Sequence, residues 1–123
     1  MSGRILIVDD APFMRAWLRG ILESGGFEVV GEVEDGEKAV TAFAELRPDV
    51  MTMDLVMPRQ SGVDAVREIM RIDPDARIVM CSAQGLEILV MEALQAGACE
   101  YFVKPLRPCC VLSTLRGVLE KGR

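Results

Sequence analysis

Residues 4–12 read RILIVDDAP, and this stretch contains the local pattern that decides the fold. Four apolar residues at positions 5–8 follow one another without a break and stop at two aspartates, Asp9 and Asp10. A short continuous apolar run is typical of a strand in a parallel sheet that is covered on both faces. Pro12 suits the first turn of a helix, where its missing N–H costs nothing. The stretch therefore predicts a buried strand, an acidic turn and a helix.

The same alternation repeats along the rest of the chain. Each further β-rich run is followed by a segment whose apolar residues have helical spacing. Asp35 and Ser61 are placed to cap the second and third of these helices. The five predicted strands are residues 4–8, 28–33, 50–54, 77–81 and 99–102. We therefore expect one α/β domain over residues 1–123, built from five βα units around a parallel sheet, with right-handed crossovers.

Composition excludes several classes of function. The 14 basic and 19 acidic residues give a net charge of −5 without a basic cluster, which argues against nucleic-acid binding. The absence of histidine excludes His-based zinc sites and Ser-His-Asp triads. No apolar run approaches the ~20 residues that span a bilayer. The first run stops at Asp9, so we expect neither a signal peptide nor an anchor, and a cytoplasmic location.

The four cysteines form no Cys-x-x-Cys motif, and a disulfide framework is not expected. We expect buried, reduced thiols on strands and helices. The positions concerned are Cys81, Cys99, Cys109 and Cys110.

The fourth helical segment, residues 86–96, is apolar around most of its circumference. A helix that covers one face of a sheet in a small domain should present polar residues to solvent. Either this helix is deeply covered or its outer face docks a partner. We favour the partner, because a chain of 123 residues has little left with which to cover it.

Polar residues gather where the predicted strands end. Asp9 and Asp10 follow the first strand, Asp54 ends the third, Ser82 follows the fourth and Lys104 comes shortly after the fifth. In open α/β sheets, ligands bind beyond the carboxyl ends of the strands, at a topological switch point. We therefore expect three carboxylates, a hydroxyl and an ammonium group to converge on one edge of the sheet.

Three clustered carboxylates repel one another strongly, since two unit charges ~4 Å apart cost about 4 kcal/mol at an effective dielectric constant near 20. Lys104 offsets one of these charges, and the remainder favours a divalent cation. Oxygen ligands without His or Cys favour Mg²⁺ over zinc. A carboxylate beside a metal ion and a lysine is a plausible phosphoryl acceptor, and the Ser82 hydroxyl could bond to a phosphoryl oxygen.

Four segments together resemble the receiver domains of two-component response regulators. They are ILIVDDAPFMR at 5–15, VMTMDLVMPRQSGVDAVREI at 50–69, IVMCSAQ at 78–84 and AGACEYFVKPL at 96–106. The likeness covers the whole chain and is strongest to the stand-alone chemotaxis regulators of this family. The resemblance implies a flavodoxin-like, doubly wound sheet with strand order 2-1-3-4-5, and a receiver domain without an output domain.

The resemblance also assigns roles to residues of the expected acidic edge. Asp54 matches the phosphoacceptor, which takes a phosphoryl group from a histidine kinase. Asp9 and Asp10 match the pair that holds Mg²⁺, and Val56 matches the position whose backbone carbonyl completes the metal ligands. Lys104 matches the lysine that pairs with the phosphoryl group.

Three further positions match the switch that follows phosphorylation in such domains. Ser82 matches the switch hydroxyl, Tyr101 the aromatic rotamer switch, and Pro105 the cis-proline after the lysine. In the family, the face of helix 4, strand 5 and helix 5 changes shape and binds a target, here most plausibly the flagellar motor switch. A phosphatase is a further partner that the resemblance implies. A stand-alone receiver in a phosphorelay or in another non-chemotaxis pathway is the alternative within the same class.

Two other classes fit the residues less well. Phosphatases with an aspartyl nucleophile often carry a second aspartate two residues later, where this chain has Val56. Flavin carriers of flavodoxin type cradle phosphate with a Ser/Thr-rich loop after the first strand, where this chain has Asp9 and Asp10. Gly-x-Gly-x-x-Gly and Walker loops are absent. We therefore expect a phosphoacceptor switch, not an enzyme, with at most slow self-dephosphorylation.

Overall fold

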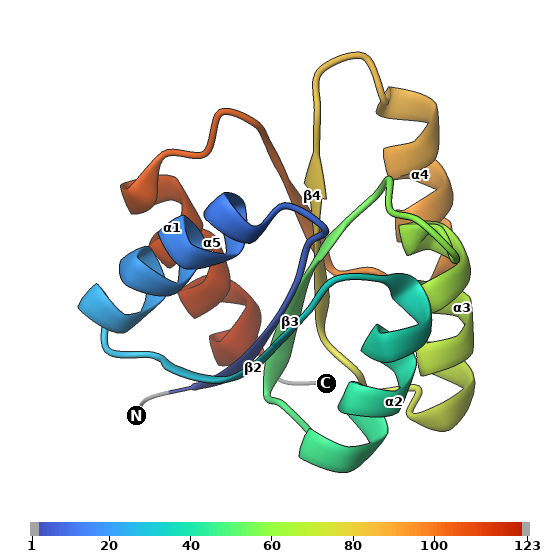
Figure 1. Cartoon of the computed structure of the whole chain (residues 1–123), viewed down its shortest axis with the longest axis horizontal. Coiled ribbons are helices and arrows are strands. Elements are labelled where there is room, and N and C mark those ends of the chain that lie inside the picture. The colour runs from blue at the N-terminus through green and yellow to red at the C-terminus, as the bar shows by residue number, and fades with distance from the viewer. Residues whose placement is uncertain (1–2, 122–123) are drawn as a thin grey trace.

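The computed structural model describes residues 3–121 and has ten alternating elements (Figure 1). The strands are β1 (Arg4–Val8), β2 (Glu28–Val33), β3 (Val50–Asp54), β4 (Ile78–Ser82) and β5 (Glu100–Val103). The helices are α1 (Pro12–Ser24), α2 (Gly36–Leu46), α3 (Gly62–Ile72), α4 (Glu87–Ala96) and α5 (Pro108–Lys121). The strands form one parallel sheet in the order β2-β1-β3-β4-β5, which confirms the predicted fold class and strand order.

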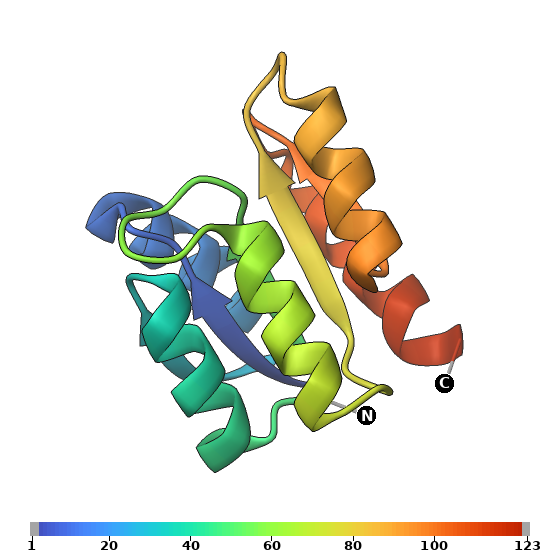
Figure 2. The ribbon, with the colours of Figure 1, turned by 90° about the vertical axis from the view of Figure 1, so that its right-hand side faces the viewer.

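The helices cover both faces of the sheet. Figure 1 shows α1 and α5 on one side and α2, α3 and α4 on the other, and Figure 2 shows the second group side by side. The side chains of each strand alternate between the two layers, so that Leu6 and Met53 pack toward α2–α4 while Ile7 and Val79 pack toward α1 and α5. Because both faces are covered, the strands are nearly all apolar, as the sequence pattern predicts.

The predicted caps form. The Asp35 side chain accepts a hydrogen bond from the Lys38 N–H at 2.8 Å, and Ser61 accepts one from the Asp64 N–H at 3.2 Å. Pro12 occupies the start of α1. These three residues fix where α2, α3 and α1 begin, and therefore where the loops at this edge of the sheet end.

The last two strands are each displaced by one residue from the prediction, to Ile78–Ser82 and Glu100–Val103. The Lys104 N–H donates to the Ser82 carbonyl at 2.7 Å, so that backbone pairing continues past the apolar run. The polar side chain of Ser82 does not end the strand, because pairing in the sheet uses only the backbone. In the described part of the chain, no helix combines the length and apolar character needed to cross a membrane.

Candidate functional site

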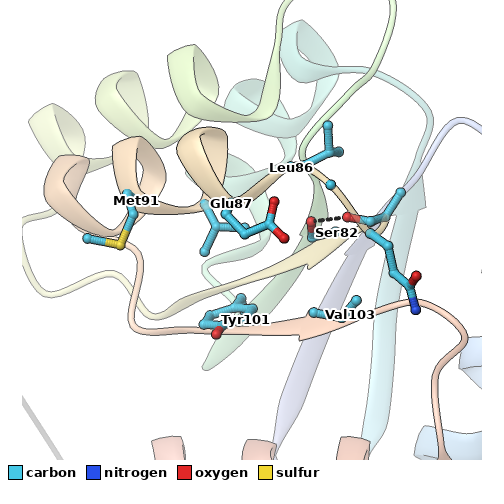
Figure 3. Close-up of a pocket in the computed structure, with 10 residues that line it drawn as sticks. Ser82, Leu86, Glu87, Met91, Tyr101 and Val103 are labelled. Carbon is cyan, nitrogen blue, oxygen red and sulfur yellow. Dashed lines mark hydrogen bonds between the residues drawn. The ribbon is translucent and has the colours of Figure 1, made fainter.

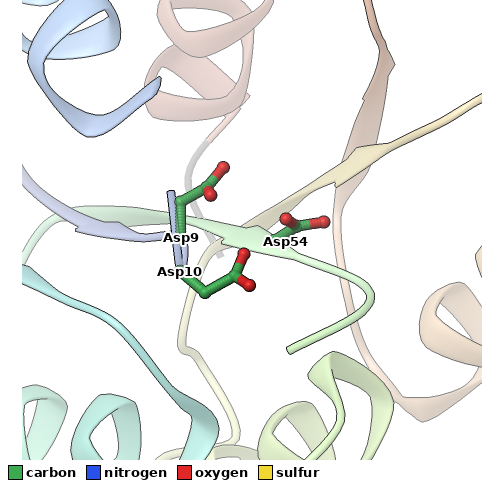
Figure 4. Close-up of side chains that lie close together, drawn as sticks. All are labelled: Asp9, Asp10 and Asp54. Atoms are coloured by element: carbon green, nitrogen blue, oxygen red, sulfur yellow. The ribbon is translucent and has the colours of Figure 1, made fainter. Parts of the chain in front are cut away.

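Three carboxylates converge at the carboxyl edge of the sheet, as the strand ends predict. Asp9 and Asp10 follow β1, and Asp54 is the last residue of β3, the strand beside it. One carboxylate oxygen from each lies within 4.8 Å of the others (Figure 4). Asp9 and Asp54 are buried, while Asp10 is exposed.

Lys104 follows β5, on the far side of β4 from Asp54, and its ammonium group places a positive charge beside these carboxylates. Its Nζ lies 3.3 Å from Asp54 Oδ2 and 3.5 Å from Asp9 Oδ2. The Lys104–Pro105 peptide bond is cis, as the family resemblance implies. The lysine therefore bridges two of the three carboxylates.

The turn after β1 is held by hydrogen bonds to the side chain and the backbone of Asp9. Asp9 Oδ1 accepts a hydrogen bond from the Ala11 N–H at 2.9 Å, and the Asp9 N–H donates to the Val33 carbonyl at 3.1 Å. The Arg15 guanidinium donates to the Asp9 carbonyl at 2.6 Å. The Arg15 contact was not predicted, because nothing in the sequence shows that a side chain on α1 turns back to this carbonyl.

The environment of Asp54 penalises its charge. Burial raises the pKa of this carboxyl, Lys104 lowers it, Asp9 raises it, and the net pKa lies above the ordinary value. For Lys104, burial alone would lower the pKa, but attraction to Asp54 and Asp9 outweighs it and the net pKa is raised. The ammonium group therefore stays charged. Because it is a single positive charge among three carboxylates, the acidic cluster keeps an excess of negative charge.

Ser82 and Val56 border the cluster. Ser82 is buried at the end of β4, and its hydroxyl donates to the Ala83 carbonyl at 2.8 Å. The Val56 N–H lies 3.5 Å from Asp54 Oδ1, a long hydrogen bond, and the Val56 side chain is exposed. Both residues thus lie where the sequence places them, at the rim that carries Asp54.

A cavity of about 550 Å³ opens between α4 and β5, next to Ser82 (Figure 3). Tyr101 and Val103 line one side of this cavity and Met91 the other. Apolar side chains remain exposed here, with Ile88 78% and Met91 56% accessible. Only Val90 and Ala93 of α4 are buried, so the deeply covered alternative for this helix is wrong. The apolar outer face of α4 is open to a partner.

The prediction for the cysteines is wrong for two of the four. Cys81 is buried in β4, where loss of solvent raises the pKa of its thiol to about 12, and Cys99 is partly buried. Cys109 and Cys110 are exposed in the first turn of α5. The buried stripe of α5 begins at Val111, so both thiols precede the packed part of the helix. None of the four, all within the described residues, forms a disulfide.

The model of the response regulator receiver domain family matches residues 5–116. The chain belongs to this family. A chemotaxis protein CheY from Thermotoga maritima is 49% identical over 96% of this chain and 98% of its own length. A CheY from Bacillus subtilis is also 49% identical, over 98% of this chain and all of its own. The predicted resemblance is confirmed, and this receiver domain is closely related to chemotaxis regulators.

Solved structures agree with the family assignment. In a crystallised CheX–CheY–BeF₃–Mg²⁺ complex from Borrelia burgdorferi, the matching chain superposes with a TM-score of 0.89 at 38% identity. The match covers 94% of this receiver domain and 87% of that chain. A LuxR-family response regulator from Aurantimonas superposes with a TM-score of 0.93 at 31% identity, over 100% and 89% of the two chains.

The donor set of the receiver domain fits a hard divalent cation. All three clustered side chains offer carboxylate oxygens, and histidine is absent from the sequence. Lys104 compensates only one negative charge of the three, and the raised pKa of Asp54 shows that its own charge is poorly compensated. Mg²⁺ binds one or two carboxylates and keeps coordination positions for waters or phosphate oxygens. Asp9, Asp10 and Asp54 are therefore suited to hold Mg²⁺.

Proposed function

We propose that this receiver domain accepts a phosphoryl group on Asp54 from the phosphohistidine of a histidine kinase. The observation that supports this most is the buried Asp54 carboxylate, whose charge is penalised by burial, beside Lys104 at 3.3 Å and two further aspartates. An Asp54 oxygen forms the new bond to phosphorus as the bond from phosphorus to the kinase nitrogen breaks. The electron pair of that bond returns to the histidine ring.

Mg²⁺ would be held by Asp9, Asp10, Asp54 and the backbone carbonyl of Val56. When bound, the ion supplies positive charge to the carboxylates and to the transferring phosphoryl oxygens. Lys104 reaches Asp54 Oδ2 and is placed to pair with a phosphoryl oxygen once Asp54 is esterified. Asp10 is the most exposed of the three aspartates and leaves the site open to the kinase.

The output is a change in the face formed by α4, β5 and α5. Ser82 donates to the Ala83 carbonyl in the unphosphorylated chain, and rotation of the same hydroxyl toward a phosphoryl oxygen would break that hydrogen bond. Such a movement frees space in the adjacent cavity, into which the half-exposed ring of Tyr101 can turn. A dianion on Asp54 thus biases a two-state element, and the domain acts as a switch, not a turnover enzyme.

The exposed apolar side chains beside this cavity support a protein target. Met91 on α4 and Tyr101 and Val103 on β5 line the cavity and remain exposed, and Ile88 on α4 is exposed as well. Since the 49%-identical relatives are chemotaxis proteins, we propose a flagellar motor-switch protein as the target and a chemotaxis kinase as the donor. A phosphatase of the same pathway would limit the lifetime of the acyl phosphate.

Treatment with acetyl phosphate and Mg²⁺, followed by intact mass and peptide mapping, tests the acceptor. The wild-type chain should gain one phosphoryl group on the peptide that contains Asp54, and Asp54→Asn should gain none. Asp64→Asn, which changes an exposed aspartate on α3, is the matched control and should label normally. Equal labelling of Asp54→Asn would exclude the proposed acceptor.

The target is tested by titrating a peptide from a motor-switch protein into the phosphorylated and unphosphorylated forms. Tighter binding to the phosphorylated form supports chemotaxis. Equal affinity for both forms would contradict this target and favour a phosphorelay or another pathway.

A further inference from the structure

The β3–α3 loop, residues 55–61, is fixed to the N-terminus of α2 by contacts that the phosphoryl chemistry does not explain. Asp35, the cap of α2, is 2% exposed, and its Oδ1 accepts from the Lys38 N–H at 2.8 Å. Its other oxygen, Oδ2, lies 3.4 Å from Nε of Arg59 in the loop. One buried carboxylate thus joins two loops at the edge of the sheet that carries Asp54.

Arg59 has an unfavourable backbone conformation. Its φ of 72° lies in the left-handed region, which costs energy for a residue with a Cβ. The guanidinium is largely exposed, so packing contributes little to keep the residue in place. The ion pair with Asp35 is the contact that opposes the strain. Among the described residues, the one other non-glycine with positive φ is Arg47, at the opposite end of α2.

The loop also lies too close to its neighbours to move as a rigid unit. A Cβ at Gly36, the first residue of α2, would lie 2.4 Å from the Gln60 carbonyl oxygen. A Cβ at Gly62 would lie 2.4 Å from the carbonyl oxygen of Asp54. Only glycine permits both approaches. The loop is therefore confined between α2 on one side and the end of β3 on the other.

This confined loop carries Val56. The Gly62 N–H donates to the Leu55 carbonyl at 2.9 Å, which closes the loop directly behind Asp54. The Val56 N–H lies 3.5 Å from Asp54 Oδ1, so a shift of the loop moves the Val56 backbone relative to the acidic cluster. Residues outside the first ligands that orient a metal site in this way usually change metal affinity when they are replaced.

We propose that Asp35 and Arg59 are positioning residues, and that their ion pair is a latch which holds the β3–α3 loop, and with it the Val56 backbone, in place for Mg²⁺. The metal part of this inference rests on the proposed function. The latch itself does not, because it is a property of the metal-free chain and is measured there.

The test combines hydrogen exchange without metal and calorimetric titration with Mg²⁺. Arg59→Gln keeps the Cβ, and with it the strain of the left-handed conformation, and removes the ion pair. Asp35→Asn keeps a capping oxygen and removes the charge. In both variants the Gln60 and Gly62 amides, corrected for intrinsic rates, should exchange about fivefold faster, the change that follows loss of roughly 1 kcal/mol of ion-pair energy. The Kd for Mg²⁺ should rise by up to the same factor of about five, because the latch acts on the metal only through the loop.

Two further variants separate positioning from a general effect on the fold. Arg47→Gln is the matched control, because Arg47 has a φ of 48° and an ion pair at 3.6 Å to Asp73, but belongs to the opposite end of α2. It should leave both the loop amides and the Mg²⁺ affinity unchanged. Arg59→Lys keeps a cation within reach of Asp35 and should restore part of the affinity lost in Arg59→Gln.

The outcomes are distinct. Faster loop exchange together with weaker Mg²⁺ binding in both latch variants, and not in Arg47→Gln, supports the latch. Unchanged loop exchange overturns it, and faster exchange with wild-type Mg²⁺ affinity overturns its connection to the metal. If the wild-type chain binds no Mg²⁺, the proposed function fails, while the exchange rates still decide whether the latch exists.

Discussion

Replacement of Asp54 by asparagine should make the metal-free protein more stable. The side chain keeps its shape and loses its charge, and it is charge that the buried site penalises. Attraction to Lys104 at 3.3 Å is worth about 5 kcal/mol at an effective dielectric constant of 20. Repulsion from Asp9, which has an oxygen within 4.8 Å, costs at least about 3.5 kcal/mol on the same scale.

These two terms leave a net attraction of at most about 1.5 kcal/mol for the Asp54 charge, and repulsion from Asp10, also within 4.8 Å, reduces it further. Withdrawal of a carboxylate from water costs several kcal/mol. Desolvation therefore dominates, in agreement with the raised pKa of Asp54, whose largest cause is burial. We expect the free energy of unfolding of Asp54→Asn to exceed that of the wild type by about 1–2 kcal/mol at pH 7, or Tm to rise by about 4–8 °C.

The pH dependence follows from the direction of the shift. The folded state binds the Asp54 proton more tightly than the unfolded chain does. The free-energy cost of burying the Asp54 charge is therefore absent below the ordinary carboxyl pKa of 3.8, where the group is protonated in both states. The penalty grows as the pH rises through the raised pKa of the folded state. The advantage of Asp54→Asn should therefore be largest at neutral pH and shrink as the pH falls.

Urea unfolding between pH 4.5 and 7 in a chelating buffer is the assay, with Asp64→Asn as the control for an exposed aspartate. The control should change the free energy of unfolding by no more than about 0.5 kcal/mol. An Asp54→Asn variant that is less stable than the wild type at pH 7 would show that Lys104 attraction outweighs desolvation, and would refute the reasoning.

Three further predictions concern the same site. Mg²⁺ at 100 times its Kd should raise the free energy of unfolding by about 2.7 kcal/mol in the wild type. Asp10→Asn should lose most of that gain, and an equal gain would remove Asp10 from the ligand set. Lys104→Met should destabilise the metal-free chain by about 2 kcal/mol in urea at pH 7, less than for a fully buried pair because Lys104 is partly exposed. An unchanged midpoint would contradict its pairing with Asp9 and Asp54. Ser82→Ala should lower the free energy of unfolding by about 1 kcal/mol or less and should label normally with acetyl phosphate. It should lose the gain in target affinity that phosphorylation gives the wild type, and a variant that keeps this gain would reject the switching role of Ser82.

The acidic site could be predicted from the sequence because parallel strands place their carboxyl ends at one edge. Asp9 and Asp10 come at the end of the first predicted strand and Asp54 at the end of the third, so the ends of these strands locate them without knowledge of the loops. The position of Lys104 could be predicted as well, because it requires only that the fifth strand lies in the same sheet. Regular backbone geometry therefore determines these positions.

Contacts that depend on loop conformation could not be predicted. The pairing of Asp35 with Arg59 requires a residue with left-handed backbone conformation inside a loop. An arginine at position 59 does not indicate such a conformation. The Ser82 hydroxyl donates to the Ala83 carbonyl, a contact that depends on a side-chain rotamer that the sequence does not determine. The exposure of Cys109 and Cys110, in contrast, could have been predicted, since Val111, Leu115 and Val118 define the buried stripe of α5 and exclude both.

The central claim is that the acidic cluster holds Mg²⁺ and prepares Asp54 for esterification. Crystals grown with Mg²⁺ and beryllofluoride test it most directly. We predict electron density for Mg²⁺ among the carboxylates of Asp9, Asp10 and Asp54, and for beryllofluoride bonded to an Asp54 oxygen and paired with Lys104. Crystals that diffract well and show neither group at these residues would contradict the account.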